Sequence, residues 1–188
     1  MTKVLVIVDM QNDFIDPKGS LYIGHDTTKL IQDIASFAKT FQGYVYLTRD
    51  AHTETDVEFE QFPKHCVAGT WGSEIVPQLS ELVKGFSISS DPPKKVHIFS
   101  KCSYTNDVIT DQLASHCFQD KDTEYYFAGV CTSICVNDVV GSLVNKAKNI
   151  GNVLPKIFIC KSLVDDFDPK MEEMCLRRMQ ILYNAKII

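Results

Sequence analysis

Val4-Leu5-Val6-Ile7-Val8 is the stretch that decides the fold, and it leads directly into the polar segment Asp9-Met10-Gln11-Asn12-Asp13. An unbroken apolar run rich in β-branched residues is typical of a strand that is buried on both faces of a parallel sheet. Similar short runs recur along the chain. They predict five further strands, at 44–48, 96–99, 124–128, 154–160 and 185–188.

Between these runs the apolar residues recur at helical spacing. The predicted helices run from Asp26 or Thr27 to Gly43, over 73–84, over 107–117, over 133–148, and onward from Pro169. Because strands alternate with helices long enough to cross over, we predict a three-layer, doubly wound α/β fold with a six-stranded, mainly parallel sheet. The segments 49–72 and 85–95 are predicted loops, and the first is long enough to suggest a functional role.

Length and composition fit a single globular domain over residues 1–188. The net charge of −5 argues against nucleic-acid binding, which usually needs a basic face. No apolar run reaches the roughly 20 residues of a membrane span, and the N-terminus lacks the features of a signal peptide. Seven cysteines without disulfide-like spacing indicate a reduced, cytoplasmic protein. The sequence does not decide whether the protein forms a homo-oligomer.

In a parallel sheet, the functional site lies beyond the carboxyl ends of the strands. We therefore expect the polar residues that follow the first four strands to meet at one edge. These residues are Asp9, Gln11, Asn12, Asp13, Arg49, Asp50, His52, Lys101, Tyr104, Cys131, Thr132, Ser133 and Cys135.

Cys135 is the candidate nucleophile, because it falls in the first turn of a predicted helix. The helix N-terminus and nearby Lys101 are expected to lower its pKa and favour the reactive thiolate. Backbone N–H groups of the turn 130–135 could form an oxyanion hole, and Asp9 could hold and deliver a proton. Cys131 is a second candidate, and a small buried side chain is the alternative for either cysteine.

A metal site is indicated by Asp50-x-His52, with His65 in the same predicted loop. Mixed carboxylate and imidazole ligands suit Zn²⁺, Fe²⁺ or Mn²⁺ and leave positions open for water or substrate. Glu58, between the two histidines, is the candidate fourth ligand. The acidic residues of this loop are Glu54, Asp56, Glu58 and Glu60. Most of them are expected to lie on a solvated face of an extended stretch.

Taken together, these motifs resemble the nicotinamidase/pyrazinamidase branch of the isochorismatase-like cysteine hydrolases. The resemblance covers nearly the whole chain and is carried by residues 6–14, 49–52, 62–70, 100–101 and 129–136. It implies that the metal trio, rather than the Asp9, Lys101 and Cys135 set alone, distinguishes nicotinamidases from other members.

The resemblance also implies a mechanism. Cys135 attacks the carboxamide of nicotinamide, ammonia leaves with a proton from Asp9, and water hydrolyses the thioester to nicotinate. Lys101 stabilises the thiolate. The metal orients the ring through its pyridine nitrogen. Zinc is the expected metal, with iron or manganese as alternatives. The expected role is pyridine nucleotide biosynthesis through NAD salvage.

The oxyanion donors implied by the resemblance are the backbone N–H groups of Cys131 and Cys135, with a cis peptide bond at Val130–Cys131. Phe14, Phe62 and Tyr104 are the expected substrate contacts; ordinary core packing is the alternative for the two phenylalanines. Ser133 stands where the family turn usually has Asp, so the orientation of the turn is in question. The segment 102–107 keeps a Tyr but otherwise departs from the family pattern.

Two other kinds of protein remain as alternatives. One is an isochorismatase-like amidase that acts on another small carboxamide or carbamoyl compound without a metal. The other is a non-catalytic binding module of similar topology, such as a flavin-binding module. That module would need a phosphate-binding loop after the first strand, where this chain carries Asp9, Asp13 and Asp16.

Overall fold

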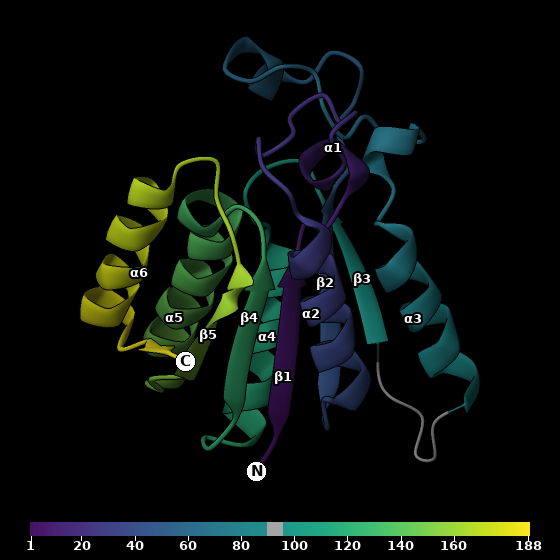
Figure 1. Cartoon of the computed structure of the whole chain (residues 1–188). Helices are drawn as coiled ribbons and strands as arrows, with labels where there is room; N and C mark the ends of the chain where they lie inside the picture. The colour runs from purple at the N-terminus through teal and green to yellow at the C-terminus, as the bar shows by residue number, and fades with distance from the viewer. Residues whose placement is uncertain (90–95) are drawn as a thin grey trace.

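The computed structural model describes residues 1–89 and 96–188. Its sheet has six strands in the order β3-β2-β1-β4-β5-β6, and every neighbouring pair is parallel (Figure 1). The strands are β1 (Lys3–Val8), β2 (Tyr44–Asp50), β3 (Val96–Lys101), β4 (Glu124–Gly129), β5 (Lys156–Val164) and β6 (Lys186–Ile187). The predicted doubly wound α/β fold is confirmed, with a sheet that is parallel throughout the described strands.

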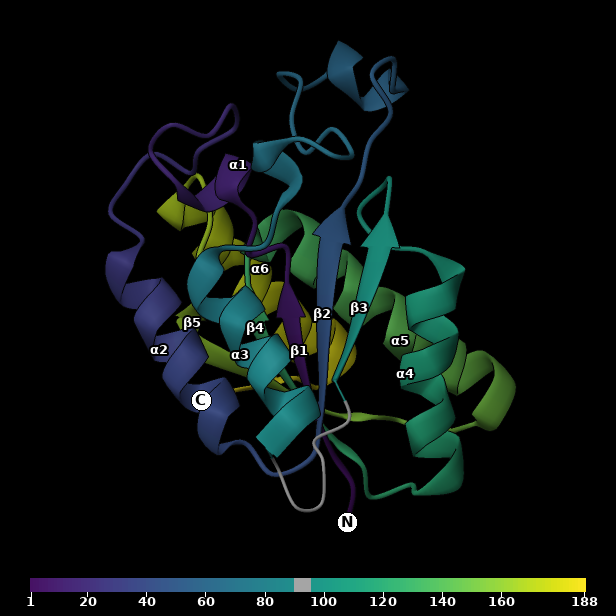
Figure 2. The same cartoon turned by 90° about the vertical axis from the view of Figure 1, so that its right-hand side faces the viewer.

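Helices cover both faces of this sheet (Figures 1 and 2). They are α1 (Asn12–Ile15), α2 (Thr28–Thr40), α3 (Pro77–Ser89), α4 (Asp107–Gln119), α5 (Asn137–Gly151) and α6 (Pro169–Tyr183). Helices α2 and α3 lie on one face, and α4, α5 and α6 lie on the other.

The burial of β1 explains why its sequence is apolar without alternation. Val4, Val6 and Val8 pack into the core beneath α4, α5 and α6. Leu5 and Ile7 face the opposite way, into the core beneath α2 and α3. All five side chains are at most 1% exposed. Burying one such side chain contributes about 1.5–3 kcal/mol, so this central strand stabilises both layers.

Several predicted boundaries were wrong. The predicted loop 85–95 is helical through Ser89, and 90–95 lies outside the described residues. Helix α3 starts at Pro77 rather than at residue 73, as suits a residue whose fixed φ favours the first helical position. The fourth predicted helix starts with a π-helical turn, Thr132–Val136, and the α-helix proper follows as α5.

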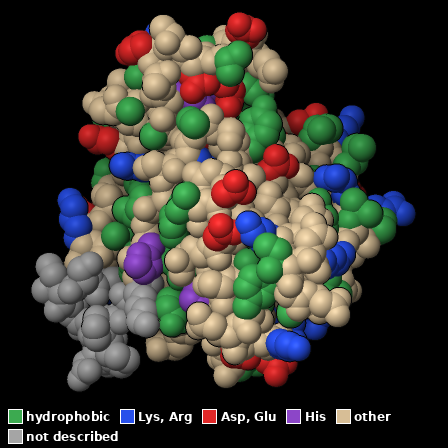
Figure 3. All heavy atoms as spheres, turned by 180° about the vertical axis from the view of Figure 1, so that it is seen from behind, with side chains coloured by type: hydrophobic (Ala, Val, Ile, Leu, Met, Phe, Trp, Pro, Cys, Tyr) green, Lys and Arg blue, Asp and Glu red, His purple; other side chains and the backbone are tan. Residues whose placement is uncertain are grey.

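On the surface, acidic and basic side chains are interspersed with apolar ones across the face seen in Figure 3. Among the described residues, no helix combines the length and apolar character needed to cross a membrane.

Candidate active site

The carboxyl ends of strands β1 to β4 bring four charged or reactive side chains together. Lys101 lies at the centre, with its Nζ 2.7 Å from Asp9 Oδ2 and 2.5 Å from Asp50 Oδ1. The same Nζ lies 3.6 Å from Cys135 Sγ. All four residues are buried. One ammonium group is therefore shared by two carboxylates and a thiol.

Asp9 is held in place at the end of β1. Its backbone has a φ of 48°, in the left-handed region, which turns the chain sharply out of the strand. The Thr48 hydroxyl donates to Asp9 Oδ1 at 2.6 Å. Burial raises the pKa of the Asp9 carboxyl, while Lys101 opposes that shift. Asp9 is therefore a better proton acceptor than an exposed aspartate.

Cys135 is positioned by an irregular turn after β4. The turn needs Gly129, which has a φ of 108° and where a Cβ atom would lie 2.0 Å from the Val8 carbonyl oxygen. The Val130–Cys131 peptide bond is cis, as the sequence resemblance implied. The Cys131 carbonyl then accepts from the N–H groups of Ile134 and Val136.

The expected lowering of the Cys135 pKa is wrong. The side chain is buried, and burial raises the pKa of the thiol well above its usual range despite the opposing effect of Lys101. Asp9 and Asp50 raise this pKa further. The resting residue is therefore a thiol, and it needs a base for activation. A carboxylate oxygen of Asp9 lies within 4.8 Å of Cys135 Sγ and is placed to serve as that base.

The metal-ligand candidates Asp50, His52 and His65 also converge. One potential ligand atom from each lies within 4.8 Å of the others. His65 Nδ1–H donates to the Pro63 carbonyl at 2.8 Å, which leaves Nε2 with a free lone pair. His52 Nε2 is buried without a hydrogen-bond partner, 3.8 Å from Asp50 Oδ2.

Two acidic residues of the loop lie against these histidines. Glu58 Oε1 lies 3.8 Å from His65 Nε2. Asp56 was expected on a solvated face, but its Oδ2 lies 3.1 Å from His52 Nδ1. The nearby carboxylate of Asp50, followed by that of Asp56, raises the pKa of His52 to about 9 against the opposing effect of burial. Such concentrated negative charge favours a bound cation.

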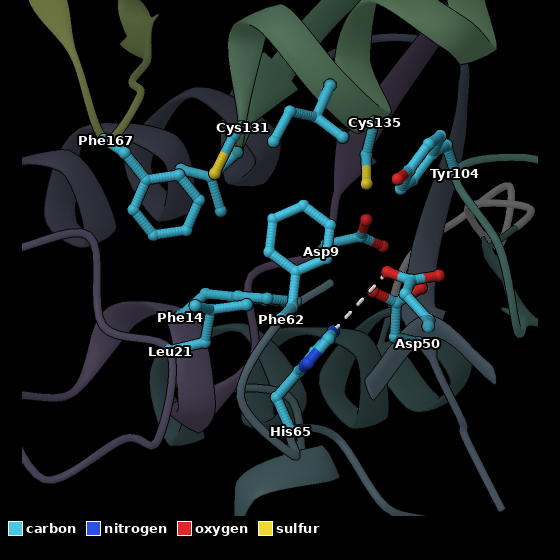
Figure 4. A pocket seen from close by; sticks show the side chains of 13 residues that line it. Asp9, Phe14, Leu21, Asp50, Phe62, His65, Tyr104, Cys131, Cys135 and Phe167 are labelled. Carbon is cyan, nitrogen blue, oxygen red and sulfur yellow. Dashed lines mark ion pairs between the residues drawn. The ribbon is translucent and has the colours of Figure 1, made fainter. Parts of the chain in front are cut away.

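Five of these polar side chains border a small cavity that is partly open to solvent: Asp9, Asp50, Glu58, His65 and Cys135. Figure 4 shows Cys135, Asp9, Asp50 and His65 pointing into it. Its lining residues are Asp9, Phe14, Leu21, Asp50, Glu58, Phe62, His65, Tyr104, Val130, Cys131, Ile134, Cys135 and Phe167. The expected substrate contacts Phe14, Phe62 and Tyr104 therefore all line the cavity. Tyr104 is the residue through which the segment 102–107 contributes to the cavity wall.

A model of the isochorismatase domain matches residues 3–188 of this chain. The chain belongs to the isochorismatase family. Its sequence is 30% identical over 156 residues to an uncharacterized isochorismatase family protein, PncA, of Bacillus subtilis, covering 80% of this chain and 82% of that protein. It is 27% identical over 173 residues to a nicotinamidase of Saccharomyces cerevisiae, covering 71% and 77% of the two chains.

A solved member of the isochorismatase family has nearly the same structure. The crystal structure of nicotinamidase/pyrazinamidase PncA from Bacillus subtilis superposes with a TM-score of 0.82 at 28% identity. The superposition covers 100% of this chain and 99% of that one.

The residues at this isochorismatase-family site fit a divalent cation. Two ligands that are each about 2.1 Å from one ion lie up to roughly 4 Å apart. The 3.8 Å separations at His52 and His65 are too long for hydrogen bonds and suit such an arrangement. Partners on the second ring nitrogen, as seen for both histidines, are the usual companions of metal-bound imidazole.

Sequence reasoning did not predict four wall residues: Leu21, Val130, Ile134 and Phe167. Phe167 follows the carboxyl end of β5, but the strand-end rule was applied to polar residues after the first four strands and so did not select it. Ser133 in place of the usual Asp left the orientation of the turn in question. Its backbone N–H donates to Asp166 Oδ2 at 2.6 Å, so a carboxylate does contact this turn, although from another segment.

Proposed function

We propose that this protein hydrolyses nicotinamide to nicotinate and ammonia through a thioester on Cys135. The observation that carries the proposal is that Asp9 and Cys135, which both contact Lys101, line the same cavity as Asp50 and His65 of the metal-ligand set. The nicotinamidase of Saccharomyces cerevisiae and the Bacillus subtilis nicotinamidase/pyrazinamidase are the relatives that support this substrate.

In the first half of the reaction, Asp9 takes the proton of the Cys135 thiol as the sulfur attacks the carboxamide carbon. A C–S bond forms, and the carbonyl electrons move onto oxygen. Backbone N–H groups of Cys131 and Cys135 stabilise this oxyanion. When the oxygen re-forms its double bond, the C–N bond breaks and nitrogen leaves as ammonia with the proton from Asp9.

In the second half, Asp9 removes a proton from water, whose oxygen attacks the thioester carbon. The C–S bond breaks and the proton on Asp9 returns to the Cys135 sulfur, while nicotinic acid is released and loses its carboxyl proton to solvent to give nicotinate. Lys101 stays charged, because the carboxylates of Asp9 and Asp50 raise its pKa well above the usual range against the opposing effect of burial. It stabilises the thiolate that forms beside Asp50 while Asp9 holds the proton.

Asp50, His52 and His65 would hold a divalent metal ion, with Glu58 as the fourth ligand. The donor set of two imidazoles and carboxylates favours zinc, with iron and manganese as alternatives. When bound, the ion supplies a Lewis-acid contact for the pyridine nitrogen of the substrate. Phe14, Phe62 and Tyr104 would contact the ring from the cavity wall.

The function is tested by measuring ammonia release from nicotinamide by the purified protein before and after metal removal. We expect activity that is lost on chelation and restored by Zn²⁺, Mn²⁺ or Fe²⁺, because ring orientation is lost while Cys135 and Asp9 stay in place. His52→Ala should contain almost no metal by elemental analysis and lose most turnover. Full activity in demonstrably metal-free protein would instead favour a metal-independent amidase for another small carboxamide or carbamoyl compound.

Glu58→Gln should weaken metal affinity about tenfold, because one anionic ligand becomes a neutral one while the other three remain. The dissociation constant can be measured by competition with a chelator. Glu60→Gln is the matched control, since it makes the same change two residues away on an exposed side chain. Equal affinities in the two variants would remove Glu58 from the ligand set.

A further inference from the structure

The segment that follows β5 packs against the turn that carries Cys135. The Asp165 carbonyl accepts from the Thr132 N–H at 2.9 Å and from the Thr132 hydroxyl at 3.0 Å. The next residue, Asp166, accepts the Ser133 N–H through its carboxylate at 2.6 Å. Two successive N–H groups of the turn are therefore held by a segment 33 residues further along the chain.

Asp166 is an unusual residue for this place. It is only 2% exposed, and none of the ion pairs among the described residues includes it. A buried carboxylate is unfavourable unless strong hydrogen bonds compensate it. Within the part of the chain that the structure describes, its other oxygen accepts one long bond, of 3.4 Å from the Asp168 N–H. The short bond from Ser133 is therefore its principal stabilising contact.

Ser133 lies two residues after Cys131 and two residues before Cys135. Inside the turn, the N–H groups of Ile134 and Val136 both bond to the Cys131 carbonyl, which closes the turn on itself. The bond to Asp166 instead ties the middle of the turn to the rest of the protein. It is thus placed to set the direction of the backbone N–H groups on either side.

We propose that Asp166 is a positioning residue that holds the turn so that the N–H groups of Cys131 and Cys135 point at the substrate carbonyl oxygen. This inference rests on the proposed function for its catalytic consequence. Asp166 does not line the cavity. Its loss therefore weakens stabilisation of the oxyanion, which forms during the reaction, more than it weakens binding of the neutral substrate.

The test compares Asp166→Ala, Asp166→Asn and the control Asp168→Asn. In Asp166→Ala we expect kcat for nicotinamide to fall about 10–100-fold while KM changes by less than about threefold. Asp166→Asn keeps an acceptor oxygen and should recover most of the loss. Asp168→Asn removes the same charge from the same loop but keeps a side-chain oxygen to cap α6, so its kcat should match the native protein.

Hydrogen exchange of the peptide that covers 131–136 supplies a readout that does not depend on activity. We expect roughly tenfold faster exchange in Asp166→Ala than in Asp168→Asn, with similar thermal unfolding midpoints. Unchanged exchange, or a rise in KM that accounts for the whole loss, would overturn the positioning role. Faster exchange in a protein that shows no nicotinamide hydrolysis at all would support the hold on the turn and reject the proposed function instead.

Discussion

Cys135→Ala should abolish nicotinamide hydrolysis, with a loss on the order of 10⁶ in kcat. The variant keeps Asp9, Lys101 and the cavity, but alanine has no atom that can form the covalent thioester. Ammonia release measures the loss. Mass spectrometry of acid-quenched native enzyme should also show a nicotinoyl adduct on the peptide that contains Cys135, and the variant should show none.

Cys131→Ala is the matched control, because both cysteines line the same cavity. In the mechanism, Cys131 contributes a backbone N–H, which alanine also has. We therefore expect this variant to keep most of its kcat, although the smaller side chain changes the cavity wall. An inactive Cys131 variant beside an active Cys135 variant would reverse the assignment of the nucleophile.

Asp9→Asn should lower kcat by about 10²–10⁴, the usual contribution of general acid–base catalysis. Asparagine has nearly the same shape and can still accept the Thr48 hydroxyl bond. It cannot, however, take the proton of the buried Cys135 thiol, whose raised pKa makes a base necessary. Alkylation of Cys135 by iodoacetamide at neutral pH should not slow in parallel, because the negative charge of Asp9 raises the pKa of the thiol and its removal does not disfavour the thiolate.

Asp122→Asn is the control for Asp9→Asn. It makes the same chemical change in a side chain that is 71% exposed and pairs with Lys156 at the surface. We expect native kcat and native alkylation rates in this control. If Asp9→Asn also kept native kcat, another group would have to carry the proton.

Much of the architecture is local in origin and so could be read from the sequence. The apolar run Val4–Val8 and the alternation of strands with helices predicted a parallel sheet, because these patterns show that the central strand is buried on both of its faces. Once the sheet was parallel, the residues after its strands had to meet at one edge. That argument, together with the motifs, brought Asp9, Asp50, Lys101 and Cys135 to a common site, which is where the structure has them.

Other features depended on contacts between distant segments, which no local pattern reports. The bond from Ser133 to Asp166 appears only when loops from different strands meet. The pKa of Cys135 is the clearest case. The sequence showed a helix start and a nearby cation, both of which lower it. The tertiary structure buries the sulfur beside two carboxylates, and the loss of solvent outweighs the single ammonium of Lys101.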